Sequence, residues 1–200
     1  MKTRRGRPRL YDADAAIQAA GEVFWSKGFS ASSLDELSSA MNMNRPSIYK
    51  AFGDKEAIYR QVMMQFVRHM EAGFQRTLAR EPDFRKGLRK FYQGALDVYT
   101  ADDTALGCLV MCTAPAAAMD HPGIQADLRA VIEQIDAQMS GRVEEAIKQG
   151  QLDANLDPKT LSRLLQAILH SLAIRARAGE SRNSLRRFID ASIALLLGND

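Results

Sequence analysis

Residues 28–55 read GFSASSLDELSSAMNMNRPSIYKAFGDK, a stretch that predicts two short helices joined by a tight turn. Ser33 and Glu36 fit a capping box, in which each side chain satisfies a backbone N–H group at the start of a helix. Asn42 falls in the turn, where we expect the left-handed conformation that Asn tolerates well. Asn44 then suits the N-cap of the next helix. This order of elements is that of a helix-turn-helix.

The second helix of this pair has one face for packing and one for a partner. Ile48 and Phe52 are four positions apart, so they share a side of the helix and should anchor it to the core. Pro46 falls in the first turn, where its missing N–H group costs nothing. Polar side chains are left to face outward, where they can reach base edges or phosphates in a DNA major groove. They are Arg45, Ser47, Tyr49 and Lys50.

The charge distribution points to the same polyanion. Residues 1–60 hold 10 Lys and Arg against 7 Asp and Glu, whereas residues 61–200 hold 17 of each. Lys55 and the free N–H groups of the helix that it begins should form a phosphate site. An extended arm with Arg5 and Arg7 could enter a narrow A·T-rich minor groove, or act as a tail that gives only non-specific attraction. A plain helical hairpin would explain the caps alone, but their agreement with the basic residues favours DNA binding.

Helical periodicity continues along nearly the whole chain and no alternating strand pattern persists. We therefore expect an all-α protein of about nine helices. The first should be capped by Asp12 or Asp14 and run to about Lys27, with Gly28 ending it. The others are expected at residues 33–40, 44–52, 55–80, 84–100, 104–118, 122–149, 158–178 and 183–197.

Composition narrows the class of protein. Two cysteines give no disulfide framework, no apolar run reaches the roughly 18 residues that span a bilayer, and no signal peptide follows the basic N-terminus. We therefore expect a cytoplasmic protein without a membrane partner. A small helical enzyme is the main rival, but no Ser/His/Asp set, carboxylate pair, Gly-rich phosphate loop or metal motif supports it. We expect no enzymatic activity and no cofactor.

The helices beyond residue 60 carry Met and aromatic residues that suit an adaptable apolar pocket. Ordinary core packing explains each of these residues taken alone, and a few polar residues among them would orient a ligand. The candidate ligand-binding residues are Phe66, Phe91, Tyr92, Met111, Met119, Gln134, Gln138 and His170.

The last two expected helices are apolar along one face, which suits either a monomer core or an interface. Paired across a two-fold axis they would make a four-helix bundle. A homodimer is favoured because one small DNA-reading unit buries too little surface to be specific. The candidate dimer residues are Leu161, Leu165, Ile168, Leu172, Leu185, Phe188, Ile189 and Ile193.

Cys108 and Cys112 lie four positions apart and would share one helix face. A metal or redox sensor could use such a pair. Zinc motifs usually carry a second pair of ligands, however, and none follows here at a suitable spacing. Free buried cysteines are the favoured interpretation, and no metal site is expected.

The chain resembles the TetR family of bacterial transcriptional regulators (TetR/AcrR type) over about residues 10–70. The matching elements are Phe24-x3-Gly28-Phe29, Ser32-Ser33-Leu34-x2-Leu37 and Pro46-Ser47-Ile48-Tyr49-x2-Phe52-x2-Lys55-Glu56. Asn42 and Pro46 depart from the family, which often has Gly at both positions; the Pro46 ring would face the groove, where a thymine methyl group suits it. The family's DNA contacts carry over onto Ser33, Arg45, Pro46, Ser47, Tyr49, Lys50 and Lys55. With Arg5, Arg7 and Asn44 they form the candidate DNA-binding set.

The resemblance implies a two-domain homodimer that regulates transcription. We expect a basic arm at residues 1–9, a DNA-binding domain at 10–70 with its helix-turn-helix at about 33–52, and a ligand-binding and dimerisation domain at 71–200. A small molecule would release this repressor from a palindromic double-stranded DNA operator. Control by a metal or redox signal at the two cysteines, or by a protein partner, remains the alternative.

Overall fold

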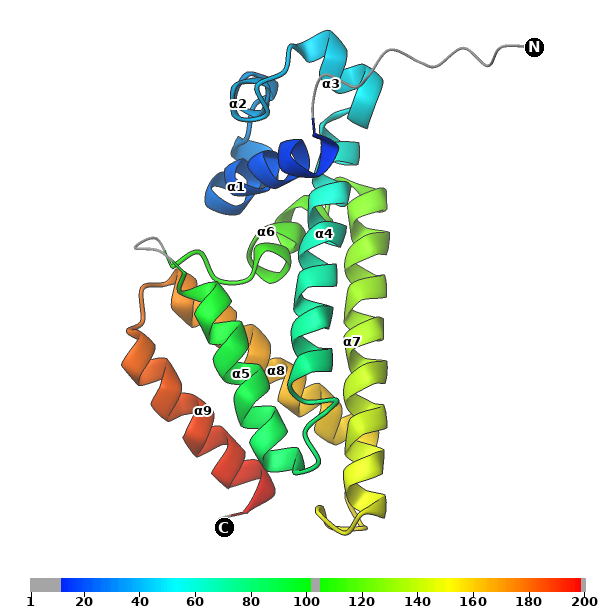
Figure 1. The fold of residues 1–200 in the computed structure, drawn as a ribbon, viewed down its shortest axis with the longest axis vertical. Coiled ribbons are helices and arrows are strands. Elements are labelled where there is room, and N and C mark those ends of the chain that lie inside the picture. The colour runs from blue at the N-terminus through cyan, green and yellow to red at the C-terminus, as the bar shows by residue number, and fades with distance from the viewer. Residues whose placement is uncertain (1–11, 102–104, 199–200) are drawn as a thin grey trace, which may run out of the picture.

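The structure, a computed structural model, describes residues 12–101 and 105–198 (Figure 1). Within these ranges the chain forms nine α-helices and no strand, which confirms the predicted fold class. The expected arm with Arg5 and Arg7 lies outside the described residues. The helices are α1 (Ala13–Ala31), α2 (Leu34–Ala40), α3 (Arg45–Phe52), α4 (Lys55–Arg76), α5 (Phe84–Tyr99), α6 (Leu109–Ala117), α7 (Pro122–Lys148), α8 (Pro158–Arg177) and α9 (Arg182–Leu197).

Helices α1, α2 and α3 form one end of the molecule, here called the head (Figure 1). Helix α4 starts at the head and runs down beside α7 into the remaining helices, here called the body (α4–α9). Helix α6 lies across the junction and packs against α1, α4, α7 and α8. The head therefore packs against α4 and α6, which connect it to the body.

Large apolar side chains join the head helices to one another and to α4. Phe24, Leu37 and Ile48, one from each head helix, are completely buried. Tyr59 of α4 is also fully buried, and its ring centroid lies 5.0 Å from that of Phe24 in an edge-to-face contact. Burying such side chains contributes roughly 1.5–3 kcal/mol each, so this cluster holds the three short helices in place.

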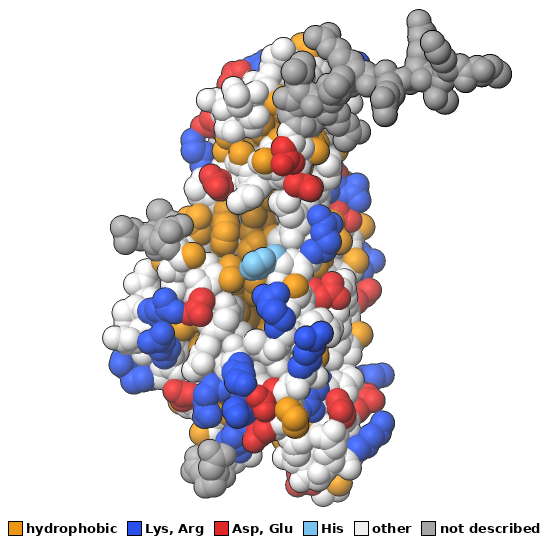
Figure 2. All heavy atoms as spheres, in the orientation of Figure 1, with side chains coloured by type: hydrophobic (Ala, Val, Ile, Leu, Met, Phe, Trp, Pro, Cys, Tyr) orange, Lys and Arg blue, Asp and Glu red, His pale blue; other side chains and the backbone are white. Residues whose placement is uncertain are grey.

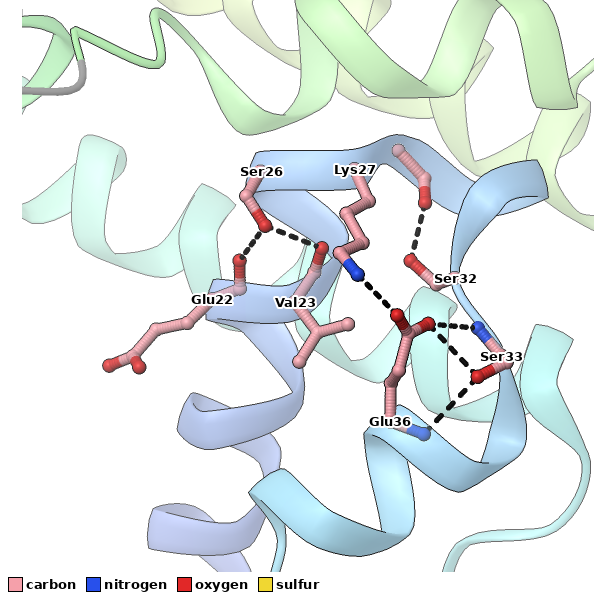
Figure 3. Close-up of polar contacts among 8 residues, drawn as sticks. Glu22, Val23, Ser26, Lys27, Ser32, Ser33 and Glu36 are labelled. Carbon is pink, nitrogen blue, oxygen red and sulfur yellow. Dashed lines mark hydrogen bonds and ion pairs between the residues drawn. The ribbon is translucent and has the colours of Figure 1, made fainter.

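The predicted capping box at the start of α2 is present (Figure 3). The Ser33 Oγ accepts a hydrogen bond from the Glu36 N–H at 3.2 Å, and the Glu36 Oε2 accepts one from the Ser33 N–H at 2.8 Å. Lys27 of α1 pairs with the same carboxylate. Lys27 first, and Ser33 second, lower the pKa of Glu36 to about 2. The carboxylate thus fixes the start of α2 and ties it to α1.

The tight turn between α2 and α3 also has the expected geometry. Asn42 has a φ of 51°, which confirms its left-handed conformation. The Asn44 Oδ1 caps α3 by accepting from the Ser47 N–H at 2.9 Å, and Pro46 lies in the first turn. The turn and caps therefore set how α3 projects from the head.

Three helix ends differ from the prediction. Helix α1 kinks at Gly28, with a φ of 80°, and then continues to Ala31. Helix α4 ends at Arg76 instead of residue 80, because the backbone of Thr77, with φ −111° and ψ −83°, has left the helical conformation. Helix α6 begins at Leu109 instead of residue 104. Gly107 precedes it with a φ of 70°, so close to α8 that a Cβ atom there would lie 2.3 Å from the Ala173 oxygen.

Six of the eight candidate dimer residues are buried in the core of the chain itself, so their side chains are not exposed to a second copy. Only Ile168 and Phe188 are partly exposed, on a face that also carries Leu164 and Leu195, which are 46% and 85% exposed. Sequence periodicity marks the apolar side of a helix but does not tell an internal contact from an external one. The six buried residues are Leu161, Leu165, Leu172, Leu185, Ile189 and Ile193.

Candidate nucleic-acid interface

Helix α3 presents opposite faces to the core and to solvent. Ile48 is fully buried and Phe52 is 7% exposed, so these two side chains fasten the helix to the head. Tyr49 between them is 48% exposed. An exposed ring flanked by polar groups is suited to contact with a partner. The exposed residues of the helix and its cap include Asn44, Arg45, Pro46, Ser47, Tyr49 and Lys50.

Arg45 is paired in the free protein. Its Nε donates to the Asp35 Oδ1 at 2.9 Å, and this contact raises the pKa of Arg45. Both side chains are more than half exposed, and ion pairs in such surroundings add little stability. The guanidinium group can therefore exchange Asp35 for a phosphate or a guanine edge at small cost.

Two of the candidate contacts act first as helix caps. The side chains of Ser33 and Asn44 are both engaged with backbone N–H groups of the helices that they begin. Their own hydrogen-bonding capacity is thus partly used within the head. Each nevertheless sits at a helix N-terminus, where the remaining N–H groups and the helix dipole attract phosphate.

Lys55 begins α4 next to the turn between α1 and α2. Its Nζ lies 4.5 Å from the centre of the Phe29 ring and 3.5 Å from the Ser30 carbonyl oxygen. Burial lowers the pKa of this ammonium group. Lys55 is half-buried rather than freely exposed, so it would meet a phosphate from a fixed position.

A group of contacts at the head–body junction was not predicted from the sequence. The Glu56 Oε2 lies 3.0 Å from the His121 Nδ1, and the His121 ring lies 4.6 Å from that of Phe29. Tyr59 and Thr113 share a hydrogen bond of 2.6 Å between their hydroxyl groups. The partners are 54 or more positions apart, and no local sequence pattern indicates such pairs.

Arg177 makes the longest-range connection across this junction. Its Nη1 donates to the carbonyl oxygens of Trp25 at 2.9 Å and Leu106 at 3.1 Å, and its Nη2 donates to that of Ser26 at 3.2 Å. The Trp25 Nε1 in turn donates to the Gly107 oxygen at 3.1 Å. The end of α8 is thereby fastened to α1 of the head and to the segment before α6.

The body contains an apolar cavity between α4, α5, α6, α7 and α8. The cavity has a volume of about 60 Å³ and is partly open to solvent. Hydrophobic side chains also gather in the middle of the face shown in Figure 2. Six of the eight candidate ligand-binding residues line this cavity, namely Phe66, Phe91, Met111, Gln134, Gln138 and His170.

The other two candidates do not line the cavity. Tyr92 is fully buried, and its hydroxyl group donates to the Leu165 carbonyl oxygen at 2.8 Å, so it joins α5 to α8. Met119 lies just beyond α6 and is 85% exposed. Both assignments are corrected, because helical periodicity does not show which apolar side chains meet at an unfilled space.

The two cysteines are free thiols in or next to α6. Burial raises the pKa of Cys108 to about 11 and also raises that of Cys112, which disfavours the reactive thiolate form. Among the described residues, no group of three or more His, Cys, Asp or Glu is placed to hold a metal ion. In the same part of the chain, no helix is both long and apolar enough to cross a membrane.

Comparison with known proteins gives matches over both parts of the chain. The model for "Bacterial regulatory proteins, tetR family" matches residues 16–62, and that for "Tetracyclin repressor-like, C-terminal domain" matches residues 85–192. The HTH-type transcriptional repressor ComR of Escherichia coli is 25% identical over 98% of this chain and 93% of its own.

Solved structures agree with these matches. A cysteine mutant of the TetR family transcriptional regulator CifR, complexed with a 26-bp double-strand operator DNA, is 27% identical, with a TM-score of 0.86 over 94% of this chain and 98% of its own. A TetR family regulator from Agrobacterium tumefaciens, at 20% identity, shares the fold with a TM-score of 0.81 over 92% of this chain and 96% of its own.

Proposed function

The chain belongs to the TetR family of bacterial regulatory proteins, and we propose that it is a repressor that a small-molecule ligand releases from a palindromic operator. The observation that carries this proposal is the exposed face of α3. Ile48 and Phe52 anchor this helix to the core, and the next helix in the chain, α4, lines the cavity. Members of this family are DNA-binding regulators, and we propose no catalytic step. The site of action would be the bacterial cytoplasm, where the DNA lies.

Helix α3 is the element that would enter the major groove. Arg45, Ser47 and Lys50 supply hydrogen-bond donors for bases and phosphates, and Tyr49 and Pro46 supply apolar surface. The N-termini of α2 and α4, with Ser33 and Lys55, would hold the flanking phosphates. CifR, a relative with the same fold, is known in complex with operator DNA, which supports DNA as the partner of this chain.

A second copy of the chain would supply the other half of the reading surface. The partly exposed face of α8 and α9 includes Leu164, Ile168, Phe188 and Leu195, and it forms a shallow apolar groove. Covering such side chains with the same face of another copy would remove them from water and produce a two-fold dimer. Two α3 helices related by this axis would enter successive major grooves about 34–36 Å apart.

The cavity and the head share helices, which gives a route for regulation. Phe66, Val67 and Met70 of α4 line the cavity, and the first turns of α4 carry the Tyr59 and Glu56 contacts to the junction. A ligand that binds better to one arrangement of α4 and α6 shifts the equilibrium toward it. If that arrangement holds the two heads at the wrong separation, the ligand lowers the affinity for the operator. The operator lowers the affinity for the ligand by the same factor, because the coupling free energy between the two sites is reciprocal.

Control by the cysteines or by a protein partner is the alternative. The raised thiol pKa values and the presence of a lined cavity favour the ligand-controlled form. For the same reason we expect no metal or other cofactor to be needed for DNA binding.

Binding to the DNA upstream of the protein's own gene tests the proposal. Lys50→Ala, on the exposed face of α3, should weaken binding at least tenfold in a fluorescence-anisotropy titration, because the lost contact is made at the centre of the interface. The matched control Lys159→Ala removes the same charge from an exposed position on α8 and should leave affinity within twofold. Equal losses from both variants would show that the attraction is only non-specific.

A further inference from the structure

The side chains that line the cavity in the body include an acidic group but no Lys or Arg among the described residues. The acidic group is the one carboxylate of the described lining, Glu71 of α4. His170 also lines the cavity, and burial lowers the pKa of this imidazole, which disfavours its charged form. The described lining therefore offers an acidic side chain without a basic one to balance it. The rest of it is largely apolar and includes four aromatic rings, those of Phe66, Phe74, Phe91 and Tyr99.

Among the described residues, the one hydrogen-bond partner of the Glu71 carboxylate is a neutral amide. The Glu71 Oε1 accepts a hydrogen bond from the Gln138 Nε2 at 2.9 Å. Within the described residues no Lys, Arg or His lies within 4.0 Å of this carboxylate, although Glu56, Glu81 and other acids of the body have such partners. A half-buried carboxylate with one amide neighbour and apolar surroundings attracts a positive charge more strongly than the same group in water.

A second polar group in the lining has no hydrogen-bond partner among the described residues. The His170 Nε2 is buried and makes no hydrogen bond to any described residue. Buried polar atoms in folded proteins nearly always have a partner, so an unsatisfied one at a cavity wall indicates a group that a ligand or a water molecule would supply. The Glu71 carboxylate on α4 and the His170 imidazole on α8 are thus two polar groups, on separate helices, that a ligand in the cavity could contact.

We propose that the cavity binds a compact lipophilic cation, such as a hydrophobic amine or quaternary ammonium ion, with its charge against Glu71 and its apolar part among the aromatic rings. This inference rests on the proposed ligand-controlled function and names the class of ligand. Aromatic faces attract cations as well as apolar groups, so the rings and the carboxylate favour the same molecule. An anion would instead be buried beside a carboxylate with no cation to compensate it.

The chain carries its own reporter for this cavity. Trp25 is the single tryptophan in the sequence, and the centroid of its ring lies 5.3 Å from the ring centroid of the cavity residue Phe66. Its fluorescence, excited at a wavelength that the probes do not absorb, should therefore change when the cavity fills. The same tryptophan is hydrogen-bonded to Gly107, so it also senses movement of the segment before α6.

Three probes of one shape and different charge test the proposal on the unmodified full-length protein. They are protonated N,N-dimethylbenzylamine, its neutral isostere isobutylbenzene, and the anion phenylacetate. The amine should bind about tenfold more tightly than the hydrocarbon, and phenylacetate should bind more weakly than both. Equal or tighter binding of the hydrocarbon or of phenylacetate would overturn the proposal, as would the absence of amine binding at millimolar concentration.

Two charge-matched variants locate the effect. Glu71→Gln should weaken amine binding about tenfold while leaving isobutylbenzene within twofold, because it removes the charge and keeps the shape. Glu133→Gln makes the same change at an exposed α7 position outside this cavity and should alter neither value. Equal effects of the two variants would overturn the assignment to Glu71.

Operator binding measured on the same samples distinguishes a wrong ligand class from a wrong repressor function. Protein that binds the operator but not the amine would refute the ligand class and leave the repressor function standing. Protein that binds the amine but not the operator would refute the repressor function instead, since the fluorescence readout does not depend on DNA.

Discussion

Replacing Arg177 by Ala should both destabilise the protein and loosen the head from the body. The guanidinium group donates to three carbonyl oxygens, two on α1 and one on the segment before α6, at 2.9–3.2 Å. Hydrogen bonds to charged groups contribute about 1.5–3 kcal/mol, and these three share one side chain and are not additive. We therefore expect a loss of about 2–3 kcal/mol in the free energy of unfolding.

Urea unfolding followed by circular dichroism measures this loss directly. In a separate thermal unfolding experiment, the melting temperature should fall by roughly 4–12 °C, since a chain of this size loses about 2–4 °C per kcal/mol. Arg175→Ala is the matched control, because Arg175 lies on the same helix and pairs with Glu180 at 3.0 Å, with the Arg175 side chain about half exposed. That pair should contribute under about 1 kcal/mol.

The structural role and the coupling role of Arg177 are separable. Arg177→Lys retains a charge but lacks the planar fork that reaches three oxygens, so it should recover only part of the stability. Once both variants are measured well below their melting temperatures, a ligand should shift their operator affinity less than in the wild-type protein. Equal stability losses for Arg177→Ala and Arg175→Ala would refute the conclusion that the Arg177 hydrogen bonds hold the head to the body.

Three further predictions concern the head. Ile48→Ala should cost about 2–4 kcal/mol of unfolding free energy and weaken operator binding, because it leaves a cavity under α3; a loss under about 1 kcal/mol in urea unfolding would contradict the packing described. Ser33→Ala should cost about 1 kcal/mol by removing the α2 cap, whereas the exposed control Ser39→Ala should be nearly neutral in the same assay. The lowered pKa of Glu36, about 2, means that its contribution to stability is fully present above its unfolded value near 4.5 and is lost as pH falls toward 2. The stability difference between wild type and Glu36→Gln should therefore shrink over that range, and a difference that grew on acidification would reverse the sign.

Local sequence patterns predicted the head well because its geometry is set by neighbours in the chain. The Ser33–Glu36 box, the left-handed Asn42 and the Asn44 cap each depend on contacts within about three residues. Such contacts leave a direct trace in residue type and spacing. The same is true of the opposite faces of α3, since Ile48 and Phe52 mark the buried side.

The cavity and the junction could be predicted only in part, because they depend on how distant helices meet. Phe66, Met111 and His170 were predicted to line a pocket, but Tyr92 and Met119 had equally suitable types and lie elsewhere. The six buried leucines and isoleucines of α8 and α9 show the same difficulty. Their periodicity is that of an apolar face, and only the packing of α5, α7 and α8 shows that the face turns inward.

Neither the Arg177 hydrogen bonds to the head nor the place of Glu71 in the cavity lining could be predicted from the sequence. An arginine near a helix C-terminus usually interacts with the carbonyl groups of its own helix. Here it reaches those of α1, more than 150 positions away. The charge of the cavity likewise depends on which side chains of five different helices face it. The described residues that line it include Glu71 and no Lys or Arg, although the helices themselves carry both, and no single stretch of sequence reveals this.

Hydroxyl-radical footprinting on the DNA upstream of the gene tests most directly that α3 of a two-fold dimer reads the operator. We predict two protected half-sites, related by a two-fold axis and centred one helical turn, about 34–36 Å, apart or a multiple of it. Tyr49→Ala and Lys50→Ala should erase the protection in both half-sites, and Lys159→Ala should not. A single protected patch, or a footprint that both α3 variants leave unchanged, would contradict the proposed interface.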